Sequence, residues 1–156
     1  MDERAIEYAK RYGFSLDLTK KLGYGTDGTV WRTNRNTAIK AFERQATYRT
    51  EKRCYLRLRD RKVSEIFGFT VPQLESFDDE LLIVEMSIVS PPFVLDFGKA
   101  YLDTKPDYTE EVLADDEAHR REMFGEDWPT AERILGYLRS LGIHYVDARP
   151  GNFTFR

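Results

Sequence analysis

Three glycines near the N-terminus have the spacing of a loop that could hold phosphate groups. They lie in Gly23-Tyr24-Gly25-Thr26-Asp27-Gly28-Thr29-Val30, which follows the pattern G-x-G-x-x-G-x-V. Glycine has no Cβ, so backbone N–H groups here could approach phosphate oxygens closely. In dinucleotide-binding folds this pattern joins a strand to a helix, whereas here β-forming residues follow it and favour a hairpin between two strands. An ordinary hairpin without a ligand is the alternative.

A lysine and a glutamate farther along the chain could position such phosphates. Lys40 ends the run Thr37-Ala38-Ile39-Lys40, and Glu51 is the only acidic residue between Arg44 and Arg59. A carboxylate beside the lysine would keep its ammonium group charged and correctly pointed. Taken singly, each residue is equally well explained as a surface residue, with the glutamate paired to a neighbouring basic side chain.

A loop near the C-terminus carries a third group of polar residues. In Gly142-Ile143-His144-Tyr145-Val146-Asp147-Ala148-Arg149-Pro150-Gly151-Asn152, an aspartate and an asparagine stand five positions apart, after a leucine-containing segment that ends in glycine. Protein-kinase catalytic loops read H-R-D-x-x-x-x-N, with the same spacing. For the loop alone, a helix C-cap followed by a turn explains the residues equally well.

In this order, these elements resemble the protein kinase-like superfamily over about residues 15–155. The resemblance implies an ATP-binding domain that uses Mg and moves the γ-phosphoryl group of ATP to a protein hydroxyl, as a serine/threonine protein kinase does. It also implies roles in catalysis. Asp147 would accept or orient the proton of the acceptor hydroxyl, Arg149 would steady the transferred phosphoryl group, and Asn152 would bind the metal.

The resemblance also implies a nucleotide site. Lys40, held by Glu51, would reach the phosphates. Val30, Ala38 and Ile83 would form the walls around the adenine ring, and hinge backbone groups would bind its edge. The expected nucleotide-binding residues are Gly23, Gly25, Gly28, Val30, Ala38, Lys40, Glu51, Met86, Ser87 and Ile88.

The elements that would position these residues follow from local pattern. Apolar periodicity predicts helices over 2–12, 45–60, 107–123 and 127–142. Runs of β-formers bounded by Gly, Asn, Asp or Pro predict strands over 16–24, 28–33, 36–42, 71–77 and 81–89. The fold class is therefore α+β: a kinase-like N-lobe (1–90), with about five antiparallel strands and one helix, followed by a short, incomplete helical C-lobe (91–156).

The sequence departs from the family pattern in three ways. Tyr145 and Val146 stand where the family has histidine and arginine. Asp96-Phe97-Gly98 spells the metal-binding D-F-G triplet, but it precedes the catalytic loop. Motif order therefore predicts a structural role for it, with a metal or ribose contact from Asp96 or Asp103 as the minority alternative.

The third departure is that only nine residues follow Asp147, so the resemblance implies a kinase-like domain truncated after its catalytic loop. The apolar stripe Ile134/Leu138/Leu141 would then need a cover, which favours a homodimer or a chain folded back on itself.

Composition excludes several classes of protein. No apolar run approaches the ~20 residues of a membrane span, the N-terminus does not look like a secretory signal, and the single cysteine, Cys54, cannot form an internal disulfide. These features predict a cytoplasmic protein. The chain is charge-asymmetric: residues 1–62 hold 16 Lys/Arg and 8 Asp/Glu, and residues 63–156 hold 8 and 19.

Three functional hypotheses follow from the sequence. The first is a small ATP-dependent phosphotransferase of weak activity. The second is a pseudokinase-type nucleotide-binding or scaffold module that lacks turnover. The third, ranked last because the net charge of -3 is acidic, is a nucleic-acid-binding or partner-binding module that uses the basic helix 44–62.

Overall fold

The β-forming runs of the first ninety residues build a five-stranded antiparallel sheet. In the computed structural model, which describes all 156 residues, the strand order is β1-β2-β3-β7-β6. The strands are β1 (Lys21–Gly25), β2 (Gly28–Arg32), β3 (Thr37–Phe42), β6 (Leu74–Asp78) and β7 (Ile83–Ser87). The glycine-rich stretch is the hairpin between β1 and β2, where Gly25 pairs with Gly28.

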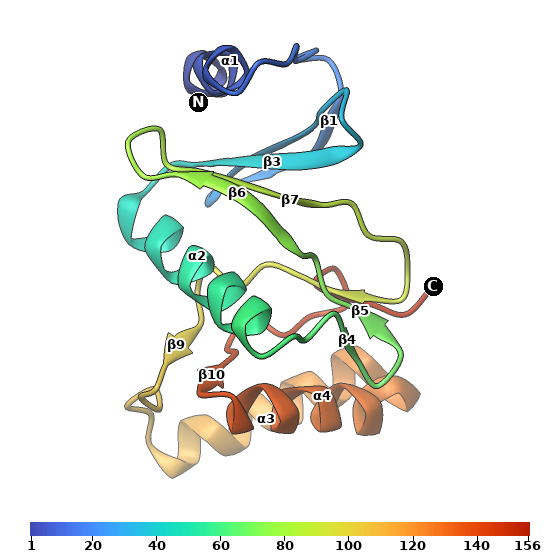
Figure 1. Cartoon of the computed structure of the whole chain (residues 1–156). Helices are drawn as coiled ribbons and strands as arrows, with labels where there is room; N and C mark the ends of the chain where they lie inside the picture. Colours follow the sequence, from blue (N-terminus) through green and yellow to red (C-terminus); the bar gives the residue numbers. More distant parts are fainter.

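Each face of this sheet is covered by one helix, as Figure 1 shows. Successive strand residues point to opposite faces, so β3 contributes to two different apolar clusters. Ile39 and Ala41 join Ala5 and Tyr8 of α1 (Asp2–Arg11) in the smaller cluster. On the other face, the larger cluster contains Ala38 and Phe42 of β3, Tyr48 and Tyr55 of α2 (Gln45–Asp60), and Val84 and Met86 of β7.

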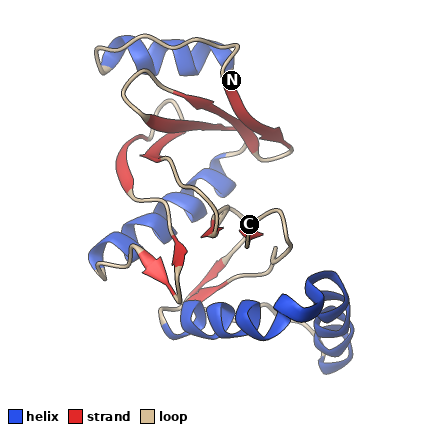
Figure 2. Ribbon diagram, turned by 90° about the vertical axis from the view of Figure 1, so that its right-hand side faces the viewer, coloured by secondary structure: helices blue, strands red, loops and turns tan.

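The remaining residues form two small sheets and a helical layer, and the helical layer lies below α2 (Figure 2). The helices are α3 (Glu110–Phe124), a 3-10 turn (Gly125–Asp127) and α4 (Trp128–Ser140). One small sheet pairs β9 (Tyr101–Leu102) with β10 (Ile143–His144). The other has the order β11-β8-β5-β4, made of Phe153–Thr154, Phe93–Val94, Phe69–Thr70 and Glu65–Ile66.

The predicted fold class is confirmed, and the bounds of α2 agree with the prediction. The first strand begins at Lys21 rather than residue 16, because Asp17 accepts hydrogen bonds from the backbone and side chain of Thr19 and holds a turn there. Helix α3 begins at Glu110 rather than residue 107. Its cap is Thr109, which accepts a hydrogen bond from Val112 N at 3.2 Å.

The apolar stripe of α4 is covered from within the chain. Ile134 and Leu138 are fully buried and belong to the larger cluster of 25 residues, which runs from the sheet through α2 to α4 and so joins the two parts of the chain. Leu141, the third residue of the stripe, is partly buried and packs against the same cluster. The sequence-based reason for expecting a homodimer, an uncovered stripe, is therefore removed.

No helix in the structure is both long and apolar enough to cross a membrane. The basic residues of α2 are partly engaged within the chain, since Lys52 pairs with Asp79 and Arg57 pairs with Asp103.

Candidate active site

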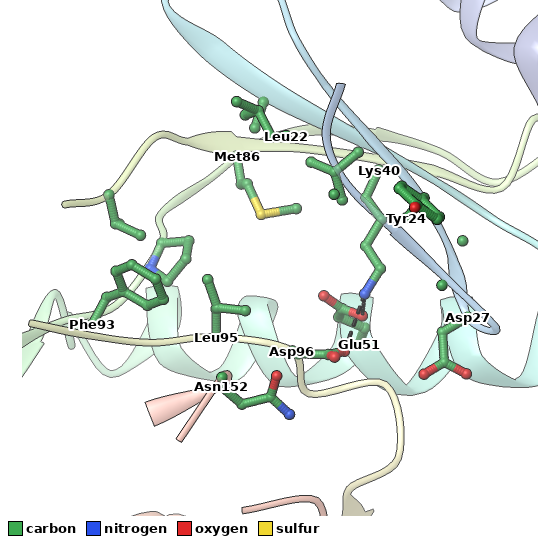
Figure 3. A pocket seen from close by; sticks show the side chains of 18 of the residues that line it. Leu22, Tyr24, Asp27, Lys40, Glu51, Met86, Phe93, Leu95, Asp96 and Asn152 are labelled. Atoms are coloured by element: carbon green, nitrogen blue, oxygen red, sulfur yellow. Dashed lines mark hydrogen bonds and ion pairs between the residues drawn. The ribbon is translucent and has the colours of Figure 1, made fainter. Parts of the chain in front are cut away.

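A cavity of about 720 Å³ lies between the main sheet and the segment that contains β8 and β11. This size suits a small-molecule or cofactor site. Figure 3 shows it between Leu22 and Met86 on the sheet side and Leu95 and Asn152 opposite. All the expected nucleotide-binding residues line this cavity, and so do Arg149 and Asn152: Gly23, Gly25, Gly28, Val30, Ala38, Lys40, Glu51, Met86, Ser87 and Ile88.

The glycines of the β1–β2 hairpin have two different structural roles. A Cβ added at Gly23 or Gly25 would meet no atom within 4 Å, so these glycines leave open space beside the cavity. At Gly28 an added Cβ would collide with the carbonyl oxygen of Ala41 in the next strand. Gly28 therefore permits the strands to pack, whereas Gly23 and Gly25 leave backbone accessible to a ligand.

Lys40 is held at the inner end of the cavity by two carboxylates. Its Nζ donates to Glu51 Oε2 at 2.7 Å and to Asp96 Oδ1 at 3.1 Å. The Lys40 and Glu51 side chains are 9% and 1% exposed, so the predicted ion pair is confirmed as a buried one. Burial alone would lower the pKa of Lys40, but the attraction of Glu51 and Asp96 outweighs it and raises that pKa. Lys40 therefore stays charged.

Glu51 experiences the opposite balance. Burial disfavours its charged form and raises its pKa from 4.5 to about 7, against the stabilising effect of Lys40. The negative charges of Asp96 and Asp27 act in the same direction as burial. Two carboxylates thus share one ammonium group, and the ion pair does not lower the Glu51 pKa as an isolated pair would.

Asp96 of the D-F-G triplet lines the cavity, a position compatible with the minority alternative considered from the sequence, whereas Phe97 is fully buried in the core. The strand before this triplet, β8, pairs antiparallel with β11, which follows Asn152. Leu95 N also donates to the Asn152 carbonyl at 3.1 Å. This ladder brings the aspartate to the site although it precedes the loop in the sequence, because strand pairing depends on register and not on chain order.

Asp96 also has a backbone conformation that few residues adopt. Its φ is +70°, in the left-handed region, which is disfavoured for residues with a Cβ and is tolerated best by Asn and Asp among them. Such conformations concentrate at functional sites. Asp103, the other aspartate considered from the sequence, does not line the cavity; it binds Arg57 Nη1 at 2.7 Å.

A column of aromatic rings connects α2 to the loop that contains Asp147. Phe97 packs between Tyr55 and Tyr145, with ring centroids 5.4 Å apart on both sides. Tyr145 also donates its hydroxyl to Leu95 O at 2.6 Å. Tyr145, noted from the sequence only as a departure from the family pattern, thus ties the loop to the backbone beside Asp96.

Asp147 lies among three hydrogen-bonding or cationic groups. Asn152 Nδ2 donates to the Asp147 carbonyl at 2.9 Å and to its carboxylate at 3.4 Å. Arg149 and Lys99 lie 3.8 and 3.7 Å from Asp147 Oδ2. Of the predicted catalytic residues, Asp147 and Arg149 are therefore neighbours, although only Arg149 is among the cavity-lining residues, and Lys40 lies apart from them at the inner end.

One predicted wall of the adenine site is wrong. Ile83 pairs with Ala41 and points to the α1 face of the sheet, away from the cavity. The period of two residues puts Met86 on the cavity side instead, together with Leu22 and Leu95. The sequence reasoning also missed Tyr55 and Lys99, which line the cavity; Tyr55 follows Glu51 by one helical turn, a spacing that could have indicated it.

Neither a protein-family model nor a curated protein sequence matches the chain. Among solved structures, it is similar to the streptomycin–ATP–APH(2")-IIa ternary complex, at 16% sequence identity and a TM-score of 0.44. The match covers 58% of this chain and 29% of that chain, so it spans less than a third of the other protein.

Proposed function

We propose that the chain binds ATP and transfers its γ-phosphoryl group to a hydroxyl acceptor, as a kinase-like phosphotransferase whose D-F-G segment precedes its catalytic loop. The observation that carries this proposal is the contact of Asp96 with Lys40, at 3.1 Å. It supplies the acidic group whose absence from the expected sequence position argued against catalysis.

The adenine would occupy the apolar end of the cavity. Val30, Ala38 and Met86 lie on the sheet side of this end, and Leu95 lies opposite them. Strands β3 and β7 place Ala38 directly beside Met86, so a small side chain there leaves room for a flat ring. The phosphates would follow the glycine hairpin toward Lys40, whose charge is already fixed by Glu51.

The residues between Lys40 and Asn152 fit a magnesium ion. Mg²⁺ prefers oxygen ligands and is commonly held by one or two carboxylates together with substrate phosphates. Asp96 offers a carboxylate whose Oδ1 alone binds Lys40. Asn152 offers an amide oxygen, because its Nδ2 is the atom that faces Asp147. A magnesium ion bound there would neutralise phosphate charge during transfer.

Asp147 would act on the acceptor. Its carboxylate would orient the acceptor hydroxyl and take its proton as the oxygen attacks the γ-phosphorus, and the bond from that phosphorus to the β–γ bridging oxygen would break. ADP would leave with the electron pair of that bond. Arg149, whose Nη2 lies 3.8 Å from Asp147 Oδ2, would lie close to the γ-phosphoryl group during its transfer. The sequence resemblance makes a protein hydroxyl the first acceptor to assay.

One observation favours a second candidate, a nucleotide-binding module without turnover. The Asp147 carboxylate already has Asn152, Arg149 and Lys99 within 3.8 Å. These contacts occupy the carboxylate, so an acceptor hydroxyl would have to displace them before Asp147 could take its proton.

Calorimetry and turnover assays on three proteins separate these candidates. Wild type should bind ATP with magnesium, Asp147→Asn should bind it almost equally, and Lys40→Ala should bind it more weakly. A positioned base contributes about 10²–10⁴-fold, so Asp147→Asn should slow transfer by about that factor. If all three proteins show the same background rate while wild type still binds ATP, the phosphotransferase proposal fails and the nucleotide-binding module without turnover remains. No binding at millimolar ATP would exclude both candidates.

A further inference from the structure

Lys99 forms a bridge across the outer end of the cavity. Its Nζ lies 3.4 Å from Asp27 Oδ2 in the glycine hairpin and 3.7 Å from Asp147 Oδ2 in the catalytic-loop segment. Asp27 and Lys99 are among the cavity-lining residues, whereas Asp147 belongs to the loop that adds Arg149 and Asn152 to the lining without lining the cavity itself. The Lys99 side chain is 47% exposed, so it can exchange one partner for another without a large rearrangement.

The backbone before Lys99 is tightly fixed. A Cβ added at Gly98 would lie 2.5 Å from Thr47 Cγ2 and 3.1 Å from Glu51 Oε2. Ala100 N also donates to Phe97 O at 3.1 Å and closes a turn around Gly98 and Lys99. The chain therefore passes close against α2 at Gly98, and only the Lys99 side chain is free to reach the space between hairpin and loop.

The carboxylates and cations that line the cavity are distributed differently at its inner and outer ends. At the inner end, the ammonium of Lys40 is shared by Glu51 and Asp96. At the outer end, Asp27 places a carboxylate, 17% exposed, in the hairpin itself. A carboxylate there would repel the terminal phosphate of a nucleotide unless a cation stands between them. Lys99 is the lysine that contacts Asp27.

We propose that Lys99 is a further catalytic residue, which binds the transferred phosphoryl group, and that Asp27 and Asp147 hold its ammonium in place while the site is empty. This inference rests on the proposed function. When the nucleotide enters, the γ-phosphate oxygens replace the two carboxylates as partners of Nζ. Asp147 is thereby released to face the acceptor hydroxyl.

In this role Lys99 takes no part in the making or breaking of bonds. The acceptor oxygen forms a bond to the γ-phosphorus, its proton passes to Asp147, and the bond to the β–γ bridging oxygen breaks in favour of ADP. Lys99 keeps its own protons throughout and acts only through its charge and hydrogen bonds. Arg149 differs from it, because Arg149 contacts Asp147 and has no ion pair with the hairpin.

Binding measurements test the proposal without requiring turnover. Calorimetry with magnesium would compare ADP with the non-hydrolysable β,γ-imido analogue of ATP for each variant. Wild type should prefer the analogue, and Lys99→Met should lose roughly tenfold of this preference, since charge-assisted hydrogen bonds to phosphate are the strong ones. Lys99→Arg should retain it. Asp27→Asn should change affinity in the opposite direction and tighten analogue binding, because it removes both the repulsion and the competing partner.

Lys105→Met is the matched control, because Lys105 is exposed and lies outside the cavity lining; it should behave as wild type. If turnover is measurable, Lys99→Met should lower kcat by about 10²–10³-fold, as loss of one transition-state donor does, and should raise the KM for ATP by roughly the same tenfold factor as for the analogue, because KM approaches the Kd when chemistry is slow. An unchanged preference for the analogue in Lys99→Met would overturn the role of Lys99 while leaving the proposed function intact. Failure of wild type to bind either nucleotide would overturn both.

Discussion

The Asp96 carboxylate accepts a hydrogen bond from the Lys40 ammonium at 3.1 Å, across 56 positions of the sequence. The contact depends on the pairing of β8 with β11, which joins a segment before α3 to a segment after α4. Two segments that are separated in the sequence by both α3 and α4 therefore meet beside Lys40.

Replacement of Asp96 tests whether this neighbourhood is functional. Asp96→Asn keeps the size of the side chain and removes the charge proposed to face the metal, so magnesium-dependent phosphoryl transfer should fall by about 10²–10³-fold, as for loss of one electrostatic group. Asp103→Asn is the control, since Asp103 binds Arg57 away from the cavity. The phosphoryl-transfer rate should depend less on magnesium concentration in Asp96→Asn than in wild type, whereas Asp103→Asn should show the wild-type dependence. The same response in both variants would contradict the metal role.

The two kinds of glycine in the hairpin should respond differently to substitution. Gly28→Ala forces a Cβ against the Ala41 carbonyl and should cost about 1–3 kcal/mol of the free energy of unfolding, as overpacking does. Gly25→Val places its side chain in open space beside the cavity and should leave stability nearly unchanged while weakening ATP binding. Urea unfolding and calorimetry on both variants check this. A large loss of stability in Gly25→Val would show that this glycine is structural.

Local pattern was sufficient to predict the sheet and most of the cavity. The glycine spacing, the run that ends in Lys40 and the single acidic residue of α2 are each defined within a few positions, and the structure brings them together around one cavity. The face of β7 was misassigned because its apolar run is nearly continuous. Without a visible alternation, the sequence did not show that Ile83 and Met86 lie on opposite faces.

The position of Asp96 in the cavity could not be predicted in the same way. The two strands that place it are two residues long each, which is too short for an alternation pattern to develop. Their pairing is a long-range event, stabilised by Tyr145, Phe97 and Phe153 in the shared core. Motif order carries no information about this pairing, because strand pairing depends on register and not on sequence order.

The hydroxyl of Tyr145 should contribute to stability. Tyr145→Phe keeps the edge-to-face contact of the ring with Phe97 but removes the hydrogen bond to Leu95 O. Loss of a buried hydrogen bond with an unpaired acceptor should cost about 1–2 kcal/mol. Tyr137→Phe is the control, because Tyr137 is only partly buried. Urea unfolding should show a lower midpoint for Tyr145→Phe at an unchanged m-value, and equal midpoints for the two variants would contradict the prediction.

The raised pKa of Glu51 predicts an unusual dependence of stability on pH. Its pKa is about 7 in the fold, against an ordinary value of 4.5. Between those two pH values the unfolded chain has lost the Glu51 proton while the folded chain retains it. Stability from this group is therefore greatest below about pH 4.5 and falls as the pH rises to about 7. The shift corresponds to a loss of up to about 3 kcal/mol.

Other groups titrate in this range, so the test is a difference between variants. Glu51→Gln preserves the shape of the side chain and removes its titration, so its unfolding free energy should decline less than that of wild type between pH 4.5 and 7. Glu43→Gln, at an exposed position, should follow the wild-type curve. The carboxylates with lowered pKa, Asp17, Asp79 and Asp103, change stability at lower pH and are common to all three proteins. Parallel curves for wild type and Glu51→Gln would mean that Glu51 is ionised throughout, and that Lys40 outweighs the burial and the neighbouring carboxylates.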